Sequence, residues 1–232
     1  MDEIARIRKA YEGRIEQGVI DRYSLFFPGE LYMLQRREEE TLRLLARHGL
    51  TSLRDLTILD VGCGRGTRFI DWMRWGALPS SIYGIDLLEP FIKEARQNVP
   101  GSHVAVGAAD HLPFPAGSFD LVVQSTVFTS ILDPSLKEAV ASEMARILRP
   151  NGFILWYDFR YPSFFNRNVR PIKLAELKSL FPGRQIVWRS LTLLPPIARK
   201  LAPVSMSACR VLESSMPLLR SHYLALIGGA PA

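Results

Sequence analysis

The sequence predicts an α/β fold, a doubly wound and mostly parallel sheet with helices on both faces. Between residues 57 and 157, continuous apolar runs of strand length alternate with stretches of helical spacing. Continuous apolar runs are typical of parallel strands that helices cover on both sides. A glycine-rich turn follows the first run directly, at the edge where open α/β sheets bind ligands.

Each element can be assigned a range from its pattern, and 232 residues suffice for one sizeable domain. Helices are expected at residues 2–17, 29–48, 67–75, 89–98, 134–148 and 172–180. Strands are expected at 57–61, 81–85, 103–107, 119–125, 153–157, 185–191 and 222–227. A proline-containing stretch between the last two strands is too long for a bare connection, so it should carry helices of its own and cover a site. The expected parts are a helical cap (1–50), a core (51–190), a covering insertion (191–220) and a last strand with tail (221–232).

The positive charge of the chain is unevenly distributed. The net charge is +6, yet residues 161–232 hold 10 basic and 2 acidic residues, which leaves 19 basic and 21 acidic residues in the first 160. An anionic partner is therefore expected to meet the last third of the chain.

Cysteine usage and hydropathy predict a cytoplasmic protein. Cys63 and Cys209 cannot form a disulfide framework, and no Cys/His group has the spacing of a zinc site, so no metal is expected. The charged N-terminus does not resemble a secretory signal, and no window of 18 uncharged apolar residues would span a membrane.

The glycine turn is the most specific motif in the chain. It reads Asp60-Val61-Gly62-Cys63-Gly64-Arg65-Gly66 and lies between a strand and a helix. A dinucleotide site favours G-x-G-x-x-G, because a pyrophosphate rests on the start of the helix. Here the glycines are spaced G-x-G-x-G, and the Asp60 carboxylate suits a cationic ammonium better than a pyrophosphate. A nicotinamide-dependent oxidoreductase on the same sheet is the alternative, although no Tyr-x-x-x-Lys pair supports it.

Four ordered motifs resemble those of class I S-adenosylmethionine (SAM)-dependent methyltransferases that act on small molecules. Besides the glycine turn they are Tyr83-Gly84-Ile85-Asp86, Leu112-Pro113-Phe114 followed by Gly117–Val122, and Met144–Gly152. The resemblance covers about residues 50–160. It implies a Rossmann-like sheet of seven strands with an antiparallel last strand, SAM as the cofactor and S-adenosylhomocysteine as its product.

The same resemblance implies which residues hold the cofactor. They are Tyr23, Asp60, Gly62, Cys63, Gly64, Gly66, Asp86, Leu87, Ala109, Asp110, His111 and Gln124. Asp86 matches the acid that binds the ribose hydroxyls, and Asp110 is the candidate contact to adenine because Ala108 replaces the family's usual Asp. Two alternatives stay open: Asp60 could brace the loop, and Asp86 could cap the next helix.

Methyl transfer to a hydroxyl of high pKa needs a general base, whereas an amine or a carboxylate does not. Asp158, at the end of the fifth strand, and His222, in the last strand, are the candidate catalytic residues. Asp158 could instead pair with Arg160, and His222 could be a packed residue. The candidate substrate contacts are Ser125, Phe128, Arg160 and Tyr161.

The acceptor is expected to be a small or medium-sized molecule that is methylated on oxygen, such as a glycan, a lipid-linked compound or a secondary metabolite. Nucleic acid is excluded as a partner, because Gln124–Val127 replaces the Asn- or Asp-Pro-Pro-aromatic motif and no Pro-Cys nucleophile occurs. Residues 191–220 are apolar with interspersed Arg199, Lys200 and Arg210, which favours either a packed lid or a peripheral membrane contact. A monomer or a homodimer is expected, and a SAM-binding protein without catalysis is a further alternative.

Overall fold

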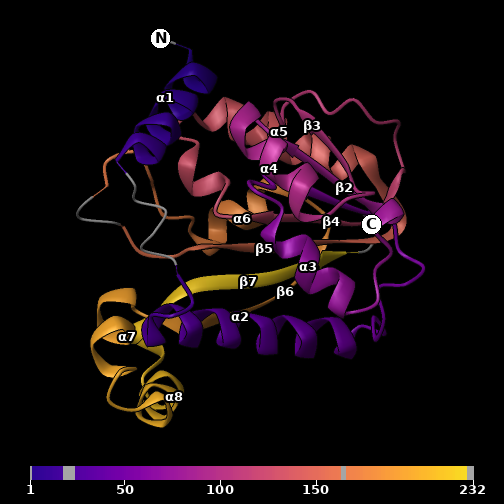
Figure 1. The fold of residues 1–232 in the computed structure, drawn as a ribbon. Helices are drawn as coiled ribbons and strands as arrows, with labels where there is room; N and C mark the ends of the chain where they lie inside the picture. The colour runs from indigo at the N-terminus through magenta and orange to yellow at the C-terminus, as the bar shows by residue number, and fades with distance from the viewer. Residues whose placement is uncertain (1, 18–23, 163–165, 229–232) are drawn as a thin grey trace.

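A twisted sheet of seven strands forms the centre of the computed structural model, which describes residues 2–17, 24–162 and 166–228 (Figure 1). The strand order is β3-β2-β1-β4-β5-β7-β6. The strands are β1 (Ile58–Val61), β2 (Ile82–Asp86), β3 (His103–Val106), β4 (Phe119–Ser125), β5 (Leu148–Phe159), β6 (Gln185–Leu193) and β7 (Arg220–Gly228). β7 runs antiparallel to both β5 and β6, and the other pairs are parallel. The predicted Rossmann-like fold class is confirmed.

Helices cover both faces of the sheet. They are α1 (Glu3–Glu16), α2 (Pro28–Arg47), α3 (Thr67–Arg74), α4 (Glu89–Asn98), α5 (Pro134–Ile147), α6 (Leu174–Leu180), α7 (Pro195–Leu201) and α8 (Met206–Ser215), with 3-10 turns at Pro79–Ser81, Phe128–Ser130 and Pro217–Leu219. The buried residues of α1, α5 and α6 form one core with the sheet. The buried residues of α2, α3 and α4 form a second core on the opposite face.

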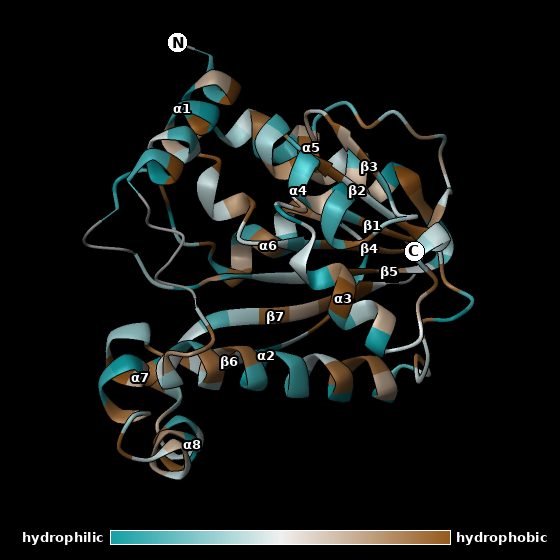
Figure 2. Cartoon of the chain, in the orientation of Figure 1, coloured by the Kyte–Doolittle hydropathy of each residue, from teal (hydrophilic) through white to brown (hydrophobic). Residues whose placement is uncertain are grey.

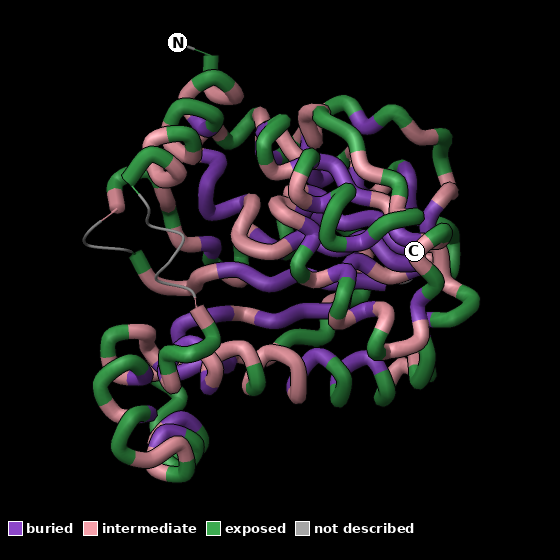
Figure 3. The backbone as a smooth tube through the Cα atoms, in the orientation of Figure 1, coloured by how far each residue is buried: buried purple, intermediate pink, exposed green. Residues whose placement is uncertain are grey.

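The alternation of side chains along the central strands separates these two cores. In β1, Leu59 packs in the core below α5, whereas Ile58 packs in the core below α2 and α3. All four β1 residues are buried, as Figure 3 shows for the strands at the centre of the molecule. Asp60 is therefore a carboxyl group inside a strand that is otherwise entirely apolar.

The helices and strands lie close to their predicted ranges, and the clearest difference is at β5. This strand begins at Leu148 and not at residue 153, so it includes Arg149, Pro150 and Asn151, which the sequence predicts as a turn. The extension is exposed and joins β4 through a register shift between Phe119 and Leu121. Tertiary contacts explain it, because Arg149 bonds to the Asp120 side chain across the shifted pair.

Residues 191–220 carry α7 and α8, in agreement with the prediction that this stretch has helices of its own. The two helices lie beside the N-terminal end of α2 (Figure 1). They enclose a small third core around Tyr32, Leu193 and Cys209. Glu213 anchors it, since this buried carboxylate accepts hydrogen bonds from Tyr32 Oη (2.6 Å) and from the backbone N–H of Leu193 (3.2 Å).

Substitution of Trp156 tests the core on the face of the sheet that α5 and α6 cover. It is fully buried between Phe128 (ring centroids 4.2 Å apart) and Phe181 (5.8 Å). Trp156→Ala should lower the free energy of unfolding by about 3–5 kcal/mol, because it removes a large apolar group and leaves a cavity. Urea denaturation measures the loss. Trp188→Ala, at a tryptophan that is 42% exposed, should cost only about 1 kcal/mol, and equal losses would contradict this assignment of the core.

Candidate functional site

The turn after β1 adopts a backbone conformation that glycine permits. Gly62, Gly64 and Gly66 have φ values of +70°, +56° and +67°, in the left-handed region. The backbone N–H groups of Gly62 and Cys63 both donate to the carbonyl of Ile85 (2.8 and 3.0 Å). These bonds tie the turn to the carboxyl end of β2.

The glycines differ in what surrounds them. A Cβ added to Gly62 would lie 2.5 Å from Val127 Cγ2, and one added to Gly66 would lie 3.0 Å from Ala95 Cβ. A Cβ at Gly64 would meet no atom within 4 Å. Gly62 and Gly66 therefore permit close packing, whereas Gly64 faces open space.

That space belongs to a cavity of about 210 Å³ at the carboxyl ends of β1, β2 and β4. Its walls come from the glycine turn, the segments after β2, β3 and β4, and α1. Six predicted cofactor residues line it, namely Gly62, Gly64, Asp86, Leu87, Ala109 and Asp110, and so does the predicted substrate contact Ser125.

Asp86 ties the glycine turn to the segment after β2. One carboxylate oxygen accepts from the backbone N–H of Gly64 (2.9 Å), and the other accepts from Leu88 at the start of α4 (3.0 Å). Burial raises the pKa of this carboxyl, and the backbone hydrogen bonds oppose the rise. Asp86 thus braces the turn and holds the backbone of Leu88, the residue before α4, while it lines the cavity.

Asp110 presents an unused acceptor to the same cavity. Its Oδ1 atom is buried and has no hydrogen-bond partner among the described residues. Its other oxygen lies 3.2 Å from Nδ1 of His111, whose own side chain is 91% exposed. A buried acceptor is costly to leave without a donor, so Oδ1 suits an amino group such as that of adenine. His111, by contrast, does not line the cavity.

α1 covers the cavity, a role that the sequence does not assign to particular residues of this helix. Ile4, Ile7, Arg8 and Tyr11 line the cavity from α1. The helix is fixed to the loop after β4, because Arg6 donates to the carbonyl of Ser130 (2.6 Å) and Glu3 accepts from the backbone N–H of Leu132 (2.6 Å). The amphipathic spacing of Ile4, Ile7 and Tyr11 was the only available signal for this cover.

Thr126 shows backbone strain at the edge of the cavity. It follows β4 directly and has a φ of +59°, which is unusual for a β-branched residue. Its backbone N–H donates to the carbonyl of Tyr157 (2.8 Å), and its own carbonyl accepts from the hydroxyls of Thr129 (3.3 Å) and Ser130 (3.2 Å). Such strain persists only where the surrounding contacts determine the conformation, and it occurs most often at functional sites.

Several predicted site residues do not line this cavity. Asp60 is fully buried on the α2 and α3 face, where Arg68 donates to it (3.2 Å). Cys63 is buried beside Gly84 in the second core, and Gly66 ends the turn at the start of α3. Gln124 lines a separate, smaller cavity on that face. Cys63 and Gly66 shape the turn, and Asp60 lies behind it because β1 directs alternate side chains to opposite faces of the sheet.

The predicted substrate contacts other than Ser125 have structural partners. Phe128 is fully buried against Trp156. Arg160 and Tyr161 donate to the carbonyls of Pro217 (3.3 Å) and Leu218 (2.9 Å), so they hold the connection between α8 and β7. Tyr23 lies outside the described residues.

Asp158 and His222 lie on opposite faces of the sheet. His222 is paired with Phe159 in the β5–β7 register and stacks on Tyr157, whereas the Asp158 carboxylate accepts from the backbone N–H groups of Thr129 (3.2 Å) and Phe159 (3.0 Å). Burial raises the pKa of Asp158 to about 7. Burial and the nearby Arg37 lower the pKa of His222 to about 3. Neither residue lines the cavity of about 210 Å³, and the structure does not bring them together as a catalytic pair.

Within the ranges 2–17, 24–162 and 166–228, no cluster of three or more His, Cys, Asp or Glu side chains could hold a metal ion. No helix in these ranges is long and apolar enough to cross a membrane.

Comparison with known proteins agrees with this geometry. Residues 59–156 match a family model described as a methyltransferase domain. This part of the chain is therefore similar to a methyltransferase domain. The glycine turn, Tyr83–Asp86, the segment 112–122 and Met144–Gly152 predict the same resemblance.

Two relatives each match less than half of this chain. Nocamycin O-methyltransferase of Saccharothrix syringae is 39% identical over 102 residues, which are 42% of this chain and 35% of that protein. Fatty-acid O-methyltransferase of Mycolicibacterium smegmatis is 35% identical over 105 residues, 44% of this chain and 37% of that protein. The chain thus spans little more than a third of the length of these two relatives. The structure of a SAM-dependent methyltransferase from Archaeoglobus fulgidus is 18% identical, has a TM-score of 0.59 and aligns over 85% of this chain and 97% of its own, which supports the fold.

The cavity of about 210 Å³ fits SAM, the cofactor that the resemblance implies. Gly64 leaves room for a ligand against the turn, and Asp86 presents a carboxylate of the type that binds ribose hydroxyls. The unpartnered Oδ1 atom of Asp110 can accept from the adenine amino group. Ala108, which replaces the family's usual Asp, also lines the cavity. Its methyl side chain cannot accept a hydrogen bond, so Asp110 is the candidate acceptor for the adenine amino group.

Gly64 can be tested against a matched glycine. Gly64→Leu should reduce the affinity for S-adenosylhomocysteine by at least 100-fold, because its side chain would project into the cavity. Gly117→Leu is the control, since Gly117 also has a positive φ (+66°) and open space but does not line the cavity. Both variants should lose about 1–2 kcal/mol of stability from backbone strain. Isothermal titration calorimetry measures the affinity, and equal affinities for the two variants would contradict the assignment.

Asp158 should make the stability of the protein depend on pH. The folded state keeps its proton up to a pKa of about 7, whereas an ordinary carboxyl loses it near 4. The folded state therefore binds more protons in this window, and stability falls as pH rises from about 4 to about 7, by about 1.4 kcal/mol for each unit of pKa difference.

Asp158→Asn should therefore lose less stability than the wild type between pH 4.5 and pH 7.5 in urea denaturation. Asp55→Asn, at an exposed aspartate, should retain the wild-type dependence on pH. A dependence in Asp158→Asn as steep as that of the wild type would show that Asp158 is ionised in the folded state throughout this range.

Proposed function

We propose that the protein transfers the methyl group of SAM to an oxygen atom of an apolar small or medium-sized acceptor. The observation that carries the proposal is the single cavity that joins the glycine turn, Asp86 and Asp110 to Ser125 and Thr126 under the apolar side of α1. The fold and the similarity to a methyltransferase domain support SAM as the methyl donor. The character of the acceptor is inferred from the residues that line the remainder of the cavity.

Most of those residues are apolar. Ile4, Ile7, Ile131, Leu136 and Val140 line the cavity from α1, α5 and the loop between β4 and α5. Such a lining favours an acceptor with a hydrocarbon body. Two of the similar proteins are O-methyltransferases by name, one for nocamycin and one for fatty acids, and these names support an oxygen acceptor of this type.

The ionisable groups of the cavity favour an acceptor that needs no strong base. Among the described residues that line it, these groups are Arg8, Tyr11, Asp86 and Asp110. Burial raises the pKa of the Tyr11 hydroxyl, which lies 2.9 Å from Ser130 Oγ. A carboxyl group or an acidic hydroxyl would enter already ionised. Asp158 and His222 stay predictions as catalytic residues, and Asp158 accepts from the backbone N–H of Thr129, which precedes Ser130 of the cavity wall.

The residues of the chain therefore contribute to the reaction by aligning the acceptor with SAM and by excluding water. Bound SAM supplies a methyl group on a positively charged sulfur, which leaves as a neutral thioether. Asp86 and Asp110 would orient the nucleoside, Thr126 and Ser125 would contact the reacting region, and α1 would keep water out. Holding the reactants in line contributes most where the leaving group is already activated.

Three matched acceptors test the choice of atom. With radiolabelled SAM, an alkylated nitrophenol and dodecanoate should each accept the methyl group faster than dodecylamine, because both present an ionised oxygen on an apolar body. Identification of the products by mass spectrometry distinguishes an ether or an ester from an amine. Transfer to the amine alone would contradict the oxygen acceptor. Tight binding of NAD(P) without binding of S-adenosylhomocysteine would favour the oxidoreductase alternative.

We also propose that an anionic membrane surface is the partner of the region around α7 and α8. Exposed apolar side chains gather there: Val204 (82% exposed), Val211 (66%) and Leu218 (75%), and Figure 2 shows apolar segments on both helices. Phe26 (97%) precedes α2, whose Gly29 packs against the backbone of Arg199 in α7.

The charge of this region suits an anionic surface. Residues 191–220 contain Arg199, Lys200, Arg210 and Arg220, and their only acidic residue, Glu213, is buried. Arg199 and Arg210 contact Glu30 and Glu39 of α2, whereas Lys200 forms no ion pair with a described residue. Exposed apolar groups with basic neighbours are typical of helices that bind at a membrane interface.

Vesicle sedimentation tests this surface. The protein should bind vesicles that contain phosphatidylglycerol at 50 mM NaCl, and binding should fall several-fold at 300 mM NaCl or on neutral vesicles. The double variant Phe26→Ser/Val204→Ser should lose most of the binding. Val106→Ser, at an exposed valine of the edge strand β3, should retain it. Failure of the wild type to bind anionic vesicles at low salt would overturn this partner.

The other expectations about the setting of the protein stay predictions. They are its location in the cytoplasm, its state as a monomer or a homodimer, and the covering role of residues 191–220. The described residues that line the cavity come from other segments of the chain.

A further inference from the structure

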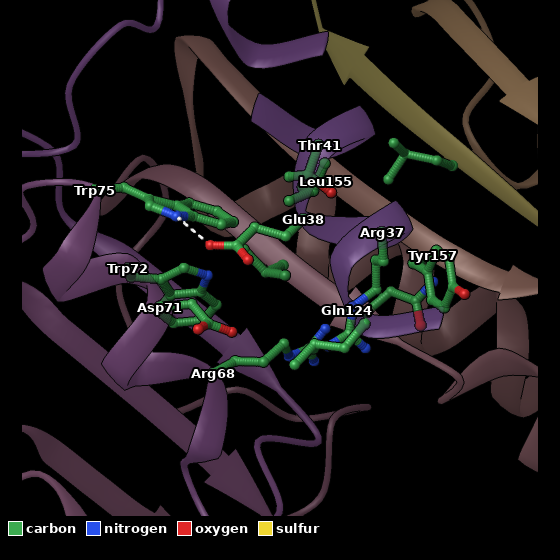
Figure 4. Close-up of a pocket in the computed structure, with 13 residues that line it drawn as sticks. Arg37, Glu38, Thr41, Arg68, Asp71, Trp72, Trp75, Gln124, Leu155 and Tyr157 are labelled. Carbon is green, nitrogen blue, oxygen red and sulfur yellow. Dashed lines mark hydrogen bonds between the residues drawn. The ribbon is translucent and has the colours of Figure 1, made fainter. Parts of the chain in front are cut away.

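A second cavity lies on the opposite face of the sheet, directly behind the glycine turn. Its volume is about 30 Å³, and α2, α3, β4, β5 and β7 form its walls. Figure 4 shows Arg37 of α2, Arg68 of α3 and Gln124 of β4 converging on it. Gln124 is paired with Val61, the residue before Gly62, so the cavity lies next to the turn.

The three side chains present hydrogen-bond donors to a cavity that the carboxylates Glu38 and Asp71 also line. Gln124 is fully buried; its Oε1 accepts from the backbone N–H of Val127 (3.2 Å), and its Nε2 has no hydrogen-bond partner among the described residues. The guanidinium of Arg37 forms no hydrogen bond or ion pair with a described residue and lies 5.5 Å from the centroid of the Tyr157 ring. Arg68 donates to Asp60 through Nη2 alone.

The acidic residues nearby are already occupied. Asp60 is paired with Arg68 (3.2 Å). Glu38 and Asp71 both contact Arg74 (3.3 and 3.4 Å), and Glu38 also accepts from Trp75 Nε1 (3.3 Å). Arg37 itself forms no ion pair with a carboxylate of a described residue. Burial and the proximity of Arg68 lower the pKa of Arg37, and the nearby Tyr157, Asp71 and Asp60 oppose this shift without cancelling it.

We propose that Arg37, Arg68 and Gln124 form a binding site for a carboxylate group. A water-sized group needs about 10–15 Å³, so a cavity of about 30 Å³ has room for the two carboxylate oxygens. The planar guanidinium of Arg37 can donate two parallel hydrogen bonds to such a group, and Nε2 of Gln124 adds a third donor.

Two molecules could supply the carboxylate. One is SAM, through its amino-acid end, and the other is a methyl acceptor that carries a carboxyl group. The first source rests on the proposed function, because it requires that SAM bind against the glycine turn. Arg37 lies outside residues 59–156, which match the family model, so this donor is a feature of the chain's own N-terminal region.

A pair of ligands that differ in one group tests the first source. S-adenosylhomocysteine is compared with its analogue in which hydrogen replaces the carboxylate, and calorimetry gives the affinity of each. The wild type should prefer S-adenosylhomocysteine by about 10- to 100-fold, the range expected for charge-assisted hydrogen bonds. Arg37→Met should abolish this preference while it retains the affinity for the analogue.

Two further variants distinguish loss of the carboxylate site from a general effect of substitution on charge or folding. Arg47→Met removes an exposed arginine from the same helix and should retain the wild-type preference. Gln124→Glu keeps the acceptor for Val127 and replaces the free donor with a negative charge, so it should abolish the preference even if Arg37→Met does not fold. Thermal unfolding of each variant checks that the fold is intact.

The second source is tested with octanoate and octan-1-ol in the presence of saturating S-adenosylhomocysteine. Fluorescence of Trp72 and Trp75, which line the cavity, reports its occupation. If the two adenosyl ligands bind equally, tighter binding of octanoate to the wild type than to Arg37→Met would assign the carboxylate to the acceptor.

The carboxylate site would be overturned if neither ligand pair distinguishes the wild type from Arg37→Met and Gln124→Glu. Absence of binding for both adenosyl ligands would instead contradict the proposed function. The octanoate measurement would then still decide whether the site exists, so the two failures are distinguishable.

Discussion

The left-handed turn at Gly62–Gly64 is the constraint on which the rest of the site depends. Its conformation places two backbone N–H groups on the carbonyl of Ile85 and a third on the carboxylate of Asp86. These bonds fix the ends of β1 and β2 relative to each other. A side chain at Gly62 would collide with Val127, so the loop after β4 can approach only because the position is glycine. The strained Thr126 lies in that same loop, and the turn and the loop together form the floor of the larger cavity.

The sheet divides the polar groups of the molecule between its two faces. Asp86, Asp110 and Tyr11 meet at the larger cavity, whereas Asp60, Arg37 and His222 lie on the side of α2 and α3. Burial raises the pKa of Asp60 to about 6 even though Arg68 is bonded to it. Because a buried charge is stable only with a partner, this second face requires compensating charge close to the glycine turn.

Local patterns account for the success of the secondary-structure predictions. The helix 89–98 and the strand 119–125 have the predicted bounds, because continuous apolar runs and helical spacing are properties of consecutive residues. The start of β5 could not be predicted in this way. Arg149 and Pro150 have no strand pattern of their own, and their place in the sheet depends on Asp120, a distant residue of β4.

The sequence by itself determined the sheet, the glycine turn and the resemblance to the methyltransferase family, since each is encoded in contiguous residues such as Asp60–Gly66 and Tyr83–Asp86. Only the tertiary structure decided which side chains share a cavity. It placed Tyr11 over Ser130, separated Asp158 from His222 across the sheet, and brought Arg37 to Gln124. The physical reason is that strand alternation and helix docking bring together residues far apart in the chain, and a one-dimensional pattern does not contain those distances.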